Sequence, residues 1–277
     1  YIAPLGQDVL FSTDKTEIGR NFANKIWNAG RFLLMNTGQI SVNKNLIDTH
    51  VDFIDEWIES KFQKSLKLFN QALDKFEINN ASKIIYSFVW NDFCDWYVEL
   101  TKNRLYNSEN EEKKSAVLTR AIYHFEEMLK MVHPFMPYIT EELWNLTQNR
   151  ESGESISISR FPEENESKIN KNAETKMNFL QDIVSSIRNI RGEMNIPPSK
   201  KINVLLKTEK IENDQIDYIK SLVKIENLEI DINSGKPRGS ASAVIKNCEI
   251  YVPLEGIIDL NLEKERLTKE ITRLKGA

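Results

Sequence analysis

The stretch GRNFANKIWNAGRFLLMN, residues 19–36, decides how the first half of this chain folds, because its apolar side chains recur at helical intervals. They follow one another at spacings of four, three and four residues: Phe22, Ile26, Ala29 and Leu33. Such spacing puts them in one stripe along an amphipathic helix. We therefore predict a helix over residues 17–36 whose apolar stripe packs against other helices.

The opposite side of this predicted helix is polar. At roughly 100° per residue, its cations and amides form one face and a flank: Arg20, Asn24, Asn28 and Arg31 on the face, and Asn21, Lys25 and Asn36 beside it. Phe32 does not join the apolar stripe and projects near Asn21 and Lys25. An aromatic ring among cations and amides suits unpaired RNA bases, because the ring stacks, the cations meet phosphates and the amides read base edges. A solvated face with Phe32 covered by a neighbouring helix explains the same pattern, and composition alone favours this second interpretation.

Apolar periodicity predicts further helices in the first half of the chain. They cover about residues 52–76, 82–106, 114–132 and, in a short turn, 140–144. His133-Pro134 ends the third of these, because proline lacks a donor and clashes with the preceding turn. Long helices with short connections predict a mainly α fold, an antiparallel helical bundle over residues 17–148, with a lead-in over residues 1–16.

The second half of the sequence has a different texture. Residues 149–172 are rich in Ser, Glu and Asn and are interpreted as a linker. Residues 173–258 begin with a fifth helix and continue with short apolar runs between polar turns, which predicts a small α/β module. Leucines seven residues apart, from Leu260 to Leu274, predict that residues 259–277 start a coiled-coil arm.

Composition excludes several functional classes. No run approaches the eighteen or so apolar residues of a membrane span, and two cysteines, Cys94 and Cys248, are too few for a disulfide framework, which favours the cytoplasm. The histidines lack metal-ligand spacing and no glycine-rich phosphate loop is present, so we expect neither a metal nor a cofactor. A net charge of −4 means that nucleic acid could be held only through a local patch.

Two further patterns lie in the predicted helix over residues 82–106. The aromatic run WNDFCDWY, residues 90–97, has its apolar members at core spacing, so packing explains it better than a stacking platform. Lys102 and Arg104, at the end of that helix, either touch phosphate or favour the helix C-terminus.

A series of segments resembles one protein family, in the same order. The segments are GQD at 6–8 with the helix at 19–32, FVWNDFCDWY at 88–97, HPFMPYITEELW at 133–144 and IRNIRGEMNIPP at 187–198. Together they are similar to the anticodon-binding part of the valyl-tRNA synthetases, a family of class I aminoacyl-tRNA synthetases, and the resemblance covers essentially the whole chain. The strings NFANKIWN and IRNIR are more specific to that family than HPFMP, which the isoleucyl and leucyl enzymes share.

The resemblance implies a role in binding tRNA(Val). In that family the helical bundle receives the anticodon loop and the first helix supplies the contacts, at positions that here are Lys25, Arg31 and Phe32. Secondary tRNA candidates are Arg20, Asn21, Asn24, Asn28, Asn36, Lys102 and Arg104. The coiled-coil arm would brace the tRNA elbow, although here it is cut short.

The resemblance also implies what this chain does not do by itself. Enzymes of the family attach valine to tRNA with ATP and Mg²⁺, but their His-Ile-Gly-His and Lys-Met-Ser-Lys-Ser types of signature, and their editing domain, do not occur in these 277 residues. We therefore expect a non-catalytic, monomeric, cytoplasmic fragment of such an enzyme. The rival hypotheses are the equivalent fragment of an isoleucyl or leucyl enzyme and a helical protein-interaction scaffold.

Overall fold

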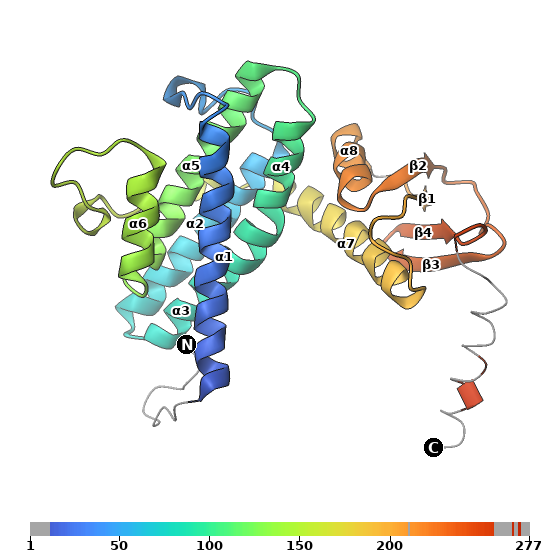
Figure 1. Cartoon of the computed structure of the whole chain (residues 1–277). Coiled ribbons are helices and arrows are strands. Elements are labelled where there is room, and N and C mark those ends of the chain that lie inside the picture. The colour runs from blue at the N-terminus through green and yellow to red at the C-terminus, as the bar shows by residue number, and fades with distance from the viewer. Residues whose placement is uncertain (1–11, 210, 258–267, 269–270, 273–277) are drawn as a thin grey trace. The chain divides into compact units, whose positions relative to one another are not determined.

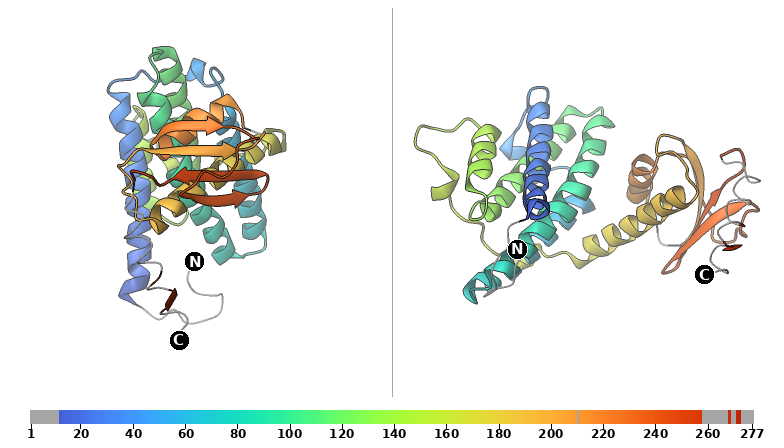
Figure 2. Two further views of the ribbon diagram at one scale, coloured as in Figure 1. Left: turned by 90° about the vertical axis from the view of Figure 1, so that its right-hand side faces the viewer. Right: turned by 60° about the horizontal axis from the view of Figure 1, so that its bottom comes forward.

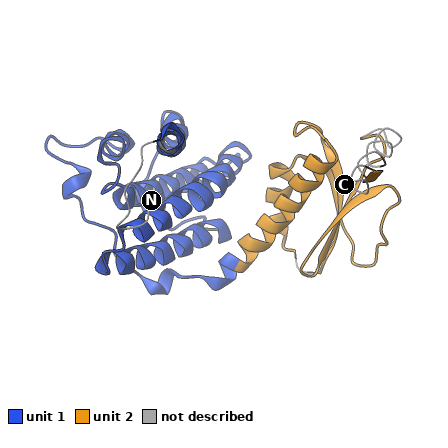
Figure 3. Ribbon diagram, turned by 90° about the horizontal axis from the view of Figure 1, so that it is seen from below, with its two compact units in different colours: residues 1–174 blue, residues 175–277 orange. Residues whose placement is uncertain are grey.

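The computed structural model describes residues 12–209, 211–257, 268, 271 and 272. The chain divides into two compact units, Tyr1–Glu174 and Thr175–Ala277 (Figure 3). The structure is mostly helical with one small mixed sheet, which agrees with the predicted mainly α class. The predicted arm at 259–277, apart from three residues, and most of the lead-in at 1–16 lie outside the described residues. The limits predicted for the individual domains stay predictions.

Unit 1 is a bundle of helices (Figures 1 and 2). Its helices are α1 Thr13–Thr37, α2 Phe53–Asp74, α3 Ile78–Ser87, α4 Val98–Tyr106, α5 Glu111–Val132 and α6 Pro137–Thr147, with the π-helix η2 Phe88–Tyr97 and the short turns η1 Lys44–Leu46, η3 Ile156–Ile158 and η4 Glu166–Lys168. α1 begins at Thr13 rather than at residue 17, because no residue in between breaks a helix and Asp14 favours the first turn. α6 begins at Pro137 rather than at residue 140, because proline suits the first helical position.

The apolar stripe predicted for α1 is confirmed. Its members are all buried: Phe22, Ile26, Ala29 and Leu33. Gly30 lets α1 approach α5 and α6 closely, since a Cβ at this position would lie 2.8 Å from Cζ of Phe125 and 2.9 Å from Cδ2 of Leu143. This direct packing on two helices fixes the direction in which the polar face of α1 points.

The helix predicted over residues 82–106 is a run of three elements, in which η2 separates α3 from α4. In the aromatic run, the rings of Phe93 and Tyr97 are buried, as the packing interpretation expects, whereas those of Trp90 and Trp96 are half-buried. The π-helix itself was not predicted. An apolar pattern in the sequence does not distinguish hydrogen bonds between residues i and i+5 from those of an ordinary α-helix.

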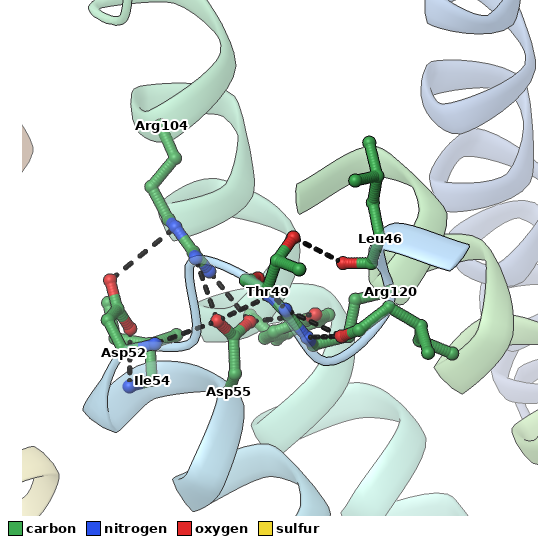
Figure 4. A network of polar contacts seen from close by, with 9 residues as sticks. Leu46, Thr49, Asp52, Ile54, Asp55, Arg104 and Arg120 are labelled. Carbon is green, nitrogen blue, oxygen red and sulfur yellow. Dashed lines mark hydrogen bonds and ion pairs between the residues drawn. The ribbon is translucent and has the colours of Figure 1, made fainter. Parts of the chain in front are cut away.

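A buried ion cluster joins three helices of the bundle (Figure 4). Asp55, in the first turn of α2, is 2% exposed and accepts hydrogen bonds of 2.7 Å from Nη1 and Nη2 of Arg104 and from Nη1 of Arg120. Arg120 also donates from Nε and Nη2 to the carbonyl oxygen of Ile47. Burial raises the pKa of Asp55, but the two guanidinium groups outweigh burial and lower it below its ordinary value. The cluster therefore connects α2, α4 and α5 with the segment that precedes α2.

Residues 149–172, which the sequence predicts as a linker, contact α2 instead. The ring of Phe161 stacks on that of Phe69, with centres 6.1 Å apart, and the backbone N–H of Asn170 donates to Oγ of Ser60 over 3.0 Å. The stretch looks like a linker in composition because its contacts are polar or few. Individual contacts along α2 hold it, which a count of Ser, Glu and Asn does not reveal.

Over residues 175–257, leaving out 210, unit 2 is a four-stranded mixed sheet with helices α7 and α8 (Figures 1 and 2). Its elements are α7 Lys171–Glu193, whose first residues belong to unit 1, β1 Ile202–Lys207, α8 Asn213–Leu222, β2 Ile225–Ile230, β3 Ser240–Ile245 and β4 Cys248–Pro253. The strand order is β2-β1-β4-β3, with β1 and β2 parallel and the other pairs antiparallel. Helix α8 connects the two parallel strands, so the small α/β module expected after the fifth helix is present.

Gly30→Ala should destabilise unit 1 by about 1–3 kcal/mol, the usual cost of overpacking a filled core. The added methyl group would overlap Phe125 and Leu143. Gly19→Ala is the matched control on the same helix, because no atom lies within 4 Å of its Cβ position. There alanine should stabilise the helix by up to about 1 kcal/mol through its propensity. Denaturant unfolding measures both variants, and equal effects would contradict the close packing of α1.

Asp55→Asn should lower the free energy of unfolding by about 3–5 kcal/mol, because Arg104 and Arg120 stay buried without their counter-charge. Asp74→Asn is the control, since Asp74 is an exposed carboxylate at the other end of α2, where a substitution should change stability by less than about 0.5 kcal/mol.

The pH dependence of stability gives a second measurement on the same variant. Because the pKa of Asp55 is lowered in the fold, its stabilisation is complete above about pH 4 and is lost as the pH falls through the folded pKa. The stabilities of wild type and Asp55→Asn should therefore converge in acid. A gap that stays constant down to pH values near 2 would show that the ionised carboxylate is not the stabilising group.

Candidate nucleic-acid interface

The outward face of α1 carries exposed cations, amides and apolar side chains. The exposed residues on this face and its edge are Arg20, Asn21, Asn24, Trp27, Asn28, Arg31 and Met35. Trp27 is 41% exposed and Met35 69% exposed, so large apolar groups lie in water beside Arg31. Arg20 pairs with Glu17 over 3.2 Å within the same helix. This mixture differs from an ordinary solvated helix face, which is polar throughout.

Lys25 lies on the flank of this face and is held by η2. Its Nζ forms an ion pair with the carboxylate of Asp95 and lies 4.6 Å from the centre of the Trp90 ring. Both partners project from the π-helix, whose backbone therefore places a negative group and an aromatic ring against the same ammonium. An anion that binds Lys25 has to compete with Asp95.

Phe32 lies two helical turns beyond Lys25 on the same flank, and it contacts α4. Its ring meets that of Tyr106 edge to face, with centres 6.5 Å apart, and its ring centre is 5.3 Å from Nζ of Lys102. Tyr106 is 68% exposed, so the two rings open to solvent. Nζ of Lys102 also donates to Glu99 over 2.6 Å. Phe32 is outside the core stripe and a neighbouring helix covers part of its ring, as the second interpretation expects, and its contact with RNA stays a prediction.

The structure places two of the secondary candidates inside the protein. Asn36 is buried and donates from Nδ2 to the carbonyl oxygen of Phe32 over 2.8 Å, so it stabilises the last turn of α1. Arg104 is 5% exposed and engages Asp55 with both Nη atoms. Neither side chain faces solvent as a surface contact requires. We therefore leave Asn36 and Arg104 out of the candidate interface.

Two clusters of side chains make up this interface. One is Lys25 with Trp90 and Asp95, and the other is Phe32 with Lys102 and Tyr106. Lys25 and Phe32 are seven positions apart, about 10 Å along a helix, so one strand of nucleic acid can reach both clusters. Partly exposed rings suit stacking of unpaired bases, and the cations beside them suit phosphates.

The sequence did not predict several residues at this interface. Trp27 had a usable signal, because at 100° per residue it projects on the same side as Arg20 and Arg31. Asp95 and Tyr106 have no local signal. Their contacts with α1 join distant positions, 70 residues apart for Lys25 and Asp95, and only the folded bundle brings them together.

The described part of the chain offers little to other kinds of site. Over those residues, no three His, Cys, Asp or Glu side chains gather as metal ligands. No described helix combines the length and the apolar character that crossing a membrane requires. Burial raises the pKa of the Cys94 thiol, behind Lys25, to about 12, so this cysteine is a core side chain and not a nucleophile.

Comparison with known proteins gives a consistent result. Residues 55–206 match the family described as the anticodon-binding domain of tRNA ligase. Valine–tRNA ligases from Fusobacterium nucleatum, Aquifex aeolicus and Listeria innocua are 37%, 38% and 36% identical to this chain over 99%, 97% and 97% of its length. The chain spans about a quarter to a third of these relatives, 32%, 25% and 31% respectively. With 99% of the chain aligned in the first case, the similarity includes α1.

Proposed function

Because this chain belongs to the family of anticodon-binding domains of tRNA ligases, we propose that it is the tRNA-binding part of a valine–tRNA ligase. The valine–tRNA ligases among its relatives support the choice of amino acid. The complete enzyme attaches valine to tRNA(Val) with ATP and Mg²⁺, through catalytic and editing domains that this chain does not include. This chain holds the tRNA, needs no cofactor of its own, and works as a monomer in the cytoplasm.

The half-buried ring of Phe32 and the exposed ring of Tyr106 beside it carry the proposal for the anticodon. An unpaired base of the anticodon loop stacks on Phe32, and Lys102 lies near enough to that ring to meet the adjoining phosphate. Arg31, exposed on the neighbouring side of α1, contacts a base edge. Lys25 exchanges Asp95 for a phosphate when RNA binds.

The remaining exposed polar residues of α1 extend the contact. They are Arg20, Asn21, Asn24 and Asn28. Amides can bond to base edges and to ribose hydroxyls, so they suit a single-stranded loop. The predicted arm at 259–277 would add contacts at the tRNA elbow.

A panel of tRNA transcripts tests the function directly. A fragment of a valine enzyme should bind tRNA(Val) more tightly than tRNA(Ile) or tRNA(Leu), and its affinity should fall steeply with salt because phosphate contacts contribute. Preference for another tRNA would assign the chain to a different ligase. Absence of binding to every tRNA, a result that the net charge of −4 would help to explain, would favour a protein-interaction scaffold.

Phe32→Ala should weaken binding of tRNA(Val) by about 1–3 kcal/mol, the usual value of one base–aromatic stack. Its effect on unfolding should stay below the roughly 3–5 kcal/mol of a core phenylalanine, because the ring lies outside the core stripe. Phe161→Ala is the matched control: its ring is 40% exposed and packs on α2, away from α1, so it should cost stability without affinity. If Phe32→Ala lost stability and kept its affinity, the ring would belong to the core.

Asp95→Asn should strengthen tRNA binding roughly two- to tenfold at low salt, because Lys25 loses its competing carboxylate and a negative charge leaves the interface. Lys25→Ala should do the opposite and lower the salt dependence by about one phosphate contact. Glu166→Gln is the control, since Glu166 pairs with Lys67 on the surface of α2. An equal gain in Glu166→Gln would mean that only the net charge matters.

A further inference from the structure

A group of cations gathers at one end of the sheet in unit 2. Strands β1 and β2 are parallel and start side by side, with Ile202 opposite Ile225, so Lys201 and Lys224 are neighbours at their entrances. The N–H of Ile202 donates to the carbonyl oxygen of Lys224 over 3.3 Å. Both lysine side chains are exposed. Like charges on adjacent strands repel each other, so this pair needs an explanation.

A buried arginine organises the backbone under these lysines. The guanidinium of Arg191, at the end of α7, donates to the carbonyl oxygens of Pro197, Lys200 and Val223 over 3.0, 2.8 and 2.7 Å. Nearby, Nη2 of the exposed Arg188 lies 3.5 Å from the carbonyl oxygen of Leu222. We call Arg191, Lys200, Lys201 and Lys224 the basic cluster. The hydrogen bonds of Arg191 hold the backbone from which the exposed lysines of this cluster project.

The basic cluster lacks the carboxylates that accompany other cations of unit 2. Those pairs are Lys176 with Glu212, Lys207 with Glu249 and Lys246 with Asp182. In the described residues, no carboxylate forms an ion pair with Arg191, Lys200, Lys201 or Lys224. Glu226, two residues after Lys224, is exposed. Nζ of Lys200 donates to the carbonyl oxygens of Gly256 and Ile257 over 3.2 and 2.8 Å. The charges of Lys201 and Lys224 are therefore the ones left for an anion from outside.

Lys224 also occupies a position at which glycine is favoured. It follows Val223, the C-cap of α8, and has a φ of 50°, in the left-handed region. Glycine adopts that conformation at less cost than any residue with a Cβ. Glycine at this position should therefore be at least as stable as lysine, so that Lys224→Gly removes the charge without adding backbone strain.

We propose that the basic cluster binds the phosphate backbone of the tRNA outside the anticodon stem and loop. This rests on the proposed function, because it gives unit 2 a part in holding the same RNA. Ammonium and guanidinium groups suit phosphates, and among the described residues of unit 2 no exposed aromatic side chain is present to stack on a base. The cluster therefore positions the RNA without reading its sequence.

The test compares a complete tRNA(Val) transcript with a hairpin that contains only its anticodon stem and loop. The double variant Lys201→Ala/Lys224→Gly should weaken tRNA binding roughly three- to tenfold at about 0.1 M salt. The slope of log K against log salt concentration should fall in magnitude by about 1.4–1.8, as the loss of two phosphate contacts requires. Binding of the hairpin should not change, whereas Phe32→Ala should weaken both RNAs.

Lys246→Gly is the matched control. Lys246 also has a positive φ, 44°, and follows Ile245 in the β3–β4 turn, which the strand register places at the Lys207 end of β1, opposite to Lys201. The substitution removes one charge from the same kind of backbone position and should leave the salt slope unchanged. Lys224→Gly should unfold at a denaturant concentration at least as high as wild type, which separates lost affinity from lost folding.

The outcomes distinguish this proposal from the proposed function. An unchanged slope in the double variant, or an equal loss in Lys246→Gly, overturns the basic cluster as an RNA contact. If wild type binds the tRNA but not the hairpin, and the double variant binds the tRNA more weakly, the cluster is supported and the anticodon site on α1 is refuted. If wild type binds neither RNA, both proposals fail.

Discussion

The pairing of Asp55 with Arg104 and Arg120 is the interaction on which the bundle most depends. Three charges are taken out of water together, which is tolerable only because both guanidinium groups face the carboxylate of Asp55 and Arg120 also donates to carbonyl oxygens. The pairing also sets the outer surface of α4. Lys102 and Tyr106 are each two positions from Arg104, about 200° around a helix, so drawing Arg104 inward turns both of them outward. The interior ion cluster and the exposed rings beside α1 are thus two sides of the same helix.

What the sequence predicts well is local. The stripe from Phe22 to Leu33 has a helical period that survives in any helical environment, and it is buried as expected. Arg104 shows the opposite case. Two cations at a helix end look like surface groups, and nothing near them in the sequence reveals a carboxylate 49 positions earlier that buries one of them. The contacts of residues 149–172 with α2 were not predicted for a related reason, since single contacts such as Phe161 on Phe69 leave no trace in composition.

The residues of the candidate interface also divide into those that local sequence predicts and those that it does not. Lys25, Arg31 and Phe32 could be chosen from one helix and a family resemblance, because their relative directions follow from helical geometry. Their partners could not. Asp95 and Tyr106 come from an element that the sequence presents as one uniform helix, and their meeting with α1 depends on how the bundle closes. The sequence therefore identifies the cations and the aromatic ring that could bind RNA. The fold determines which of these cations already pairs with a carboxylate of the protein, as Lys25 does with Asp95.

The π-helix between α3 and α4 changes which side chains of these two helices lie on the same face. Hydrogen bonds from residue i to i+5 place more residues in each turn than an α-helix does, so the faces of α4 are rotated relative to those of α3. A wheel drawn continuously from Ile78 to Tyr106 would assign the wrong neighbours beyond Phe88. Removing one residue from η2 would rotate α4 by about 100° against the rest of the bundle. The number of residues in η2 is thus constrained as strictly as any side chain, because it sets the direction in which the faces of α4 point.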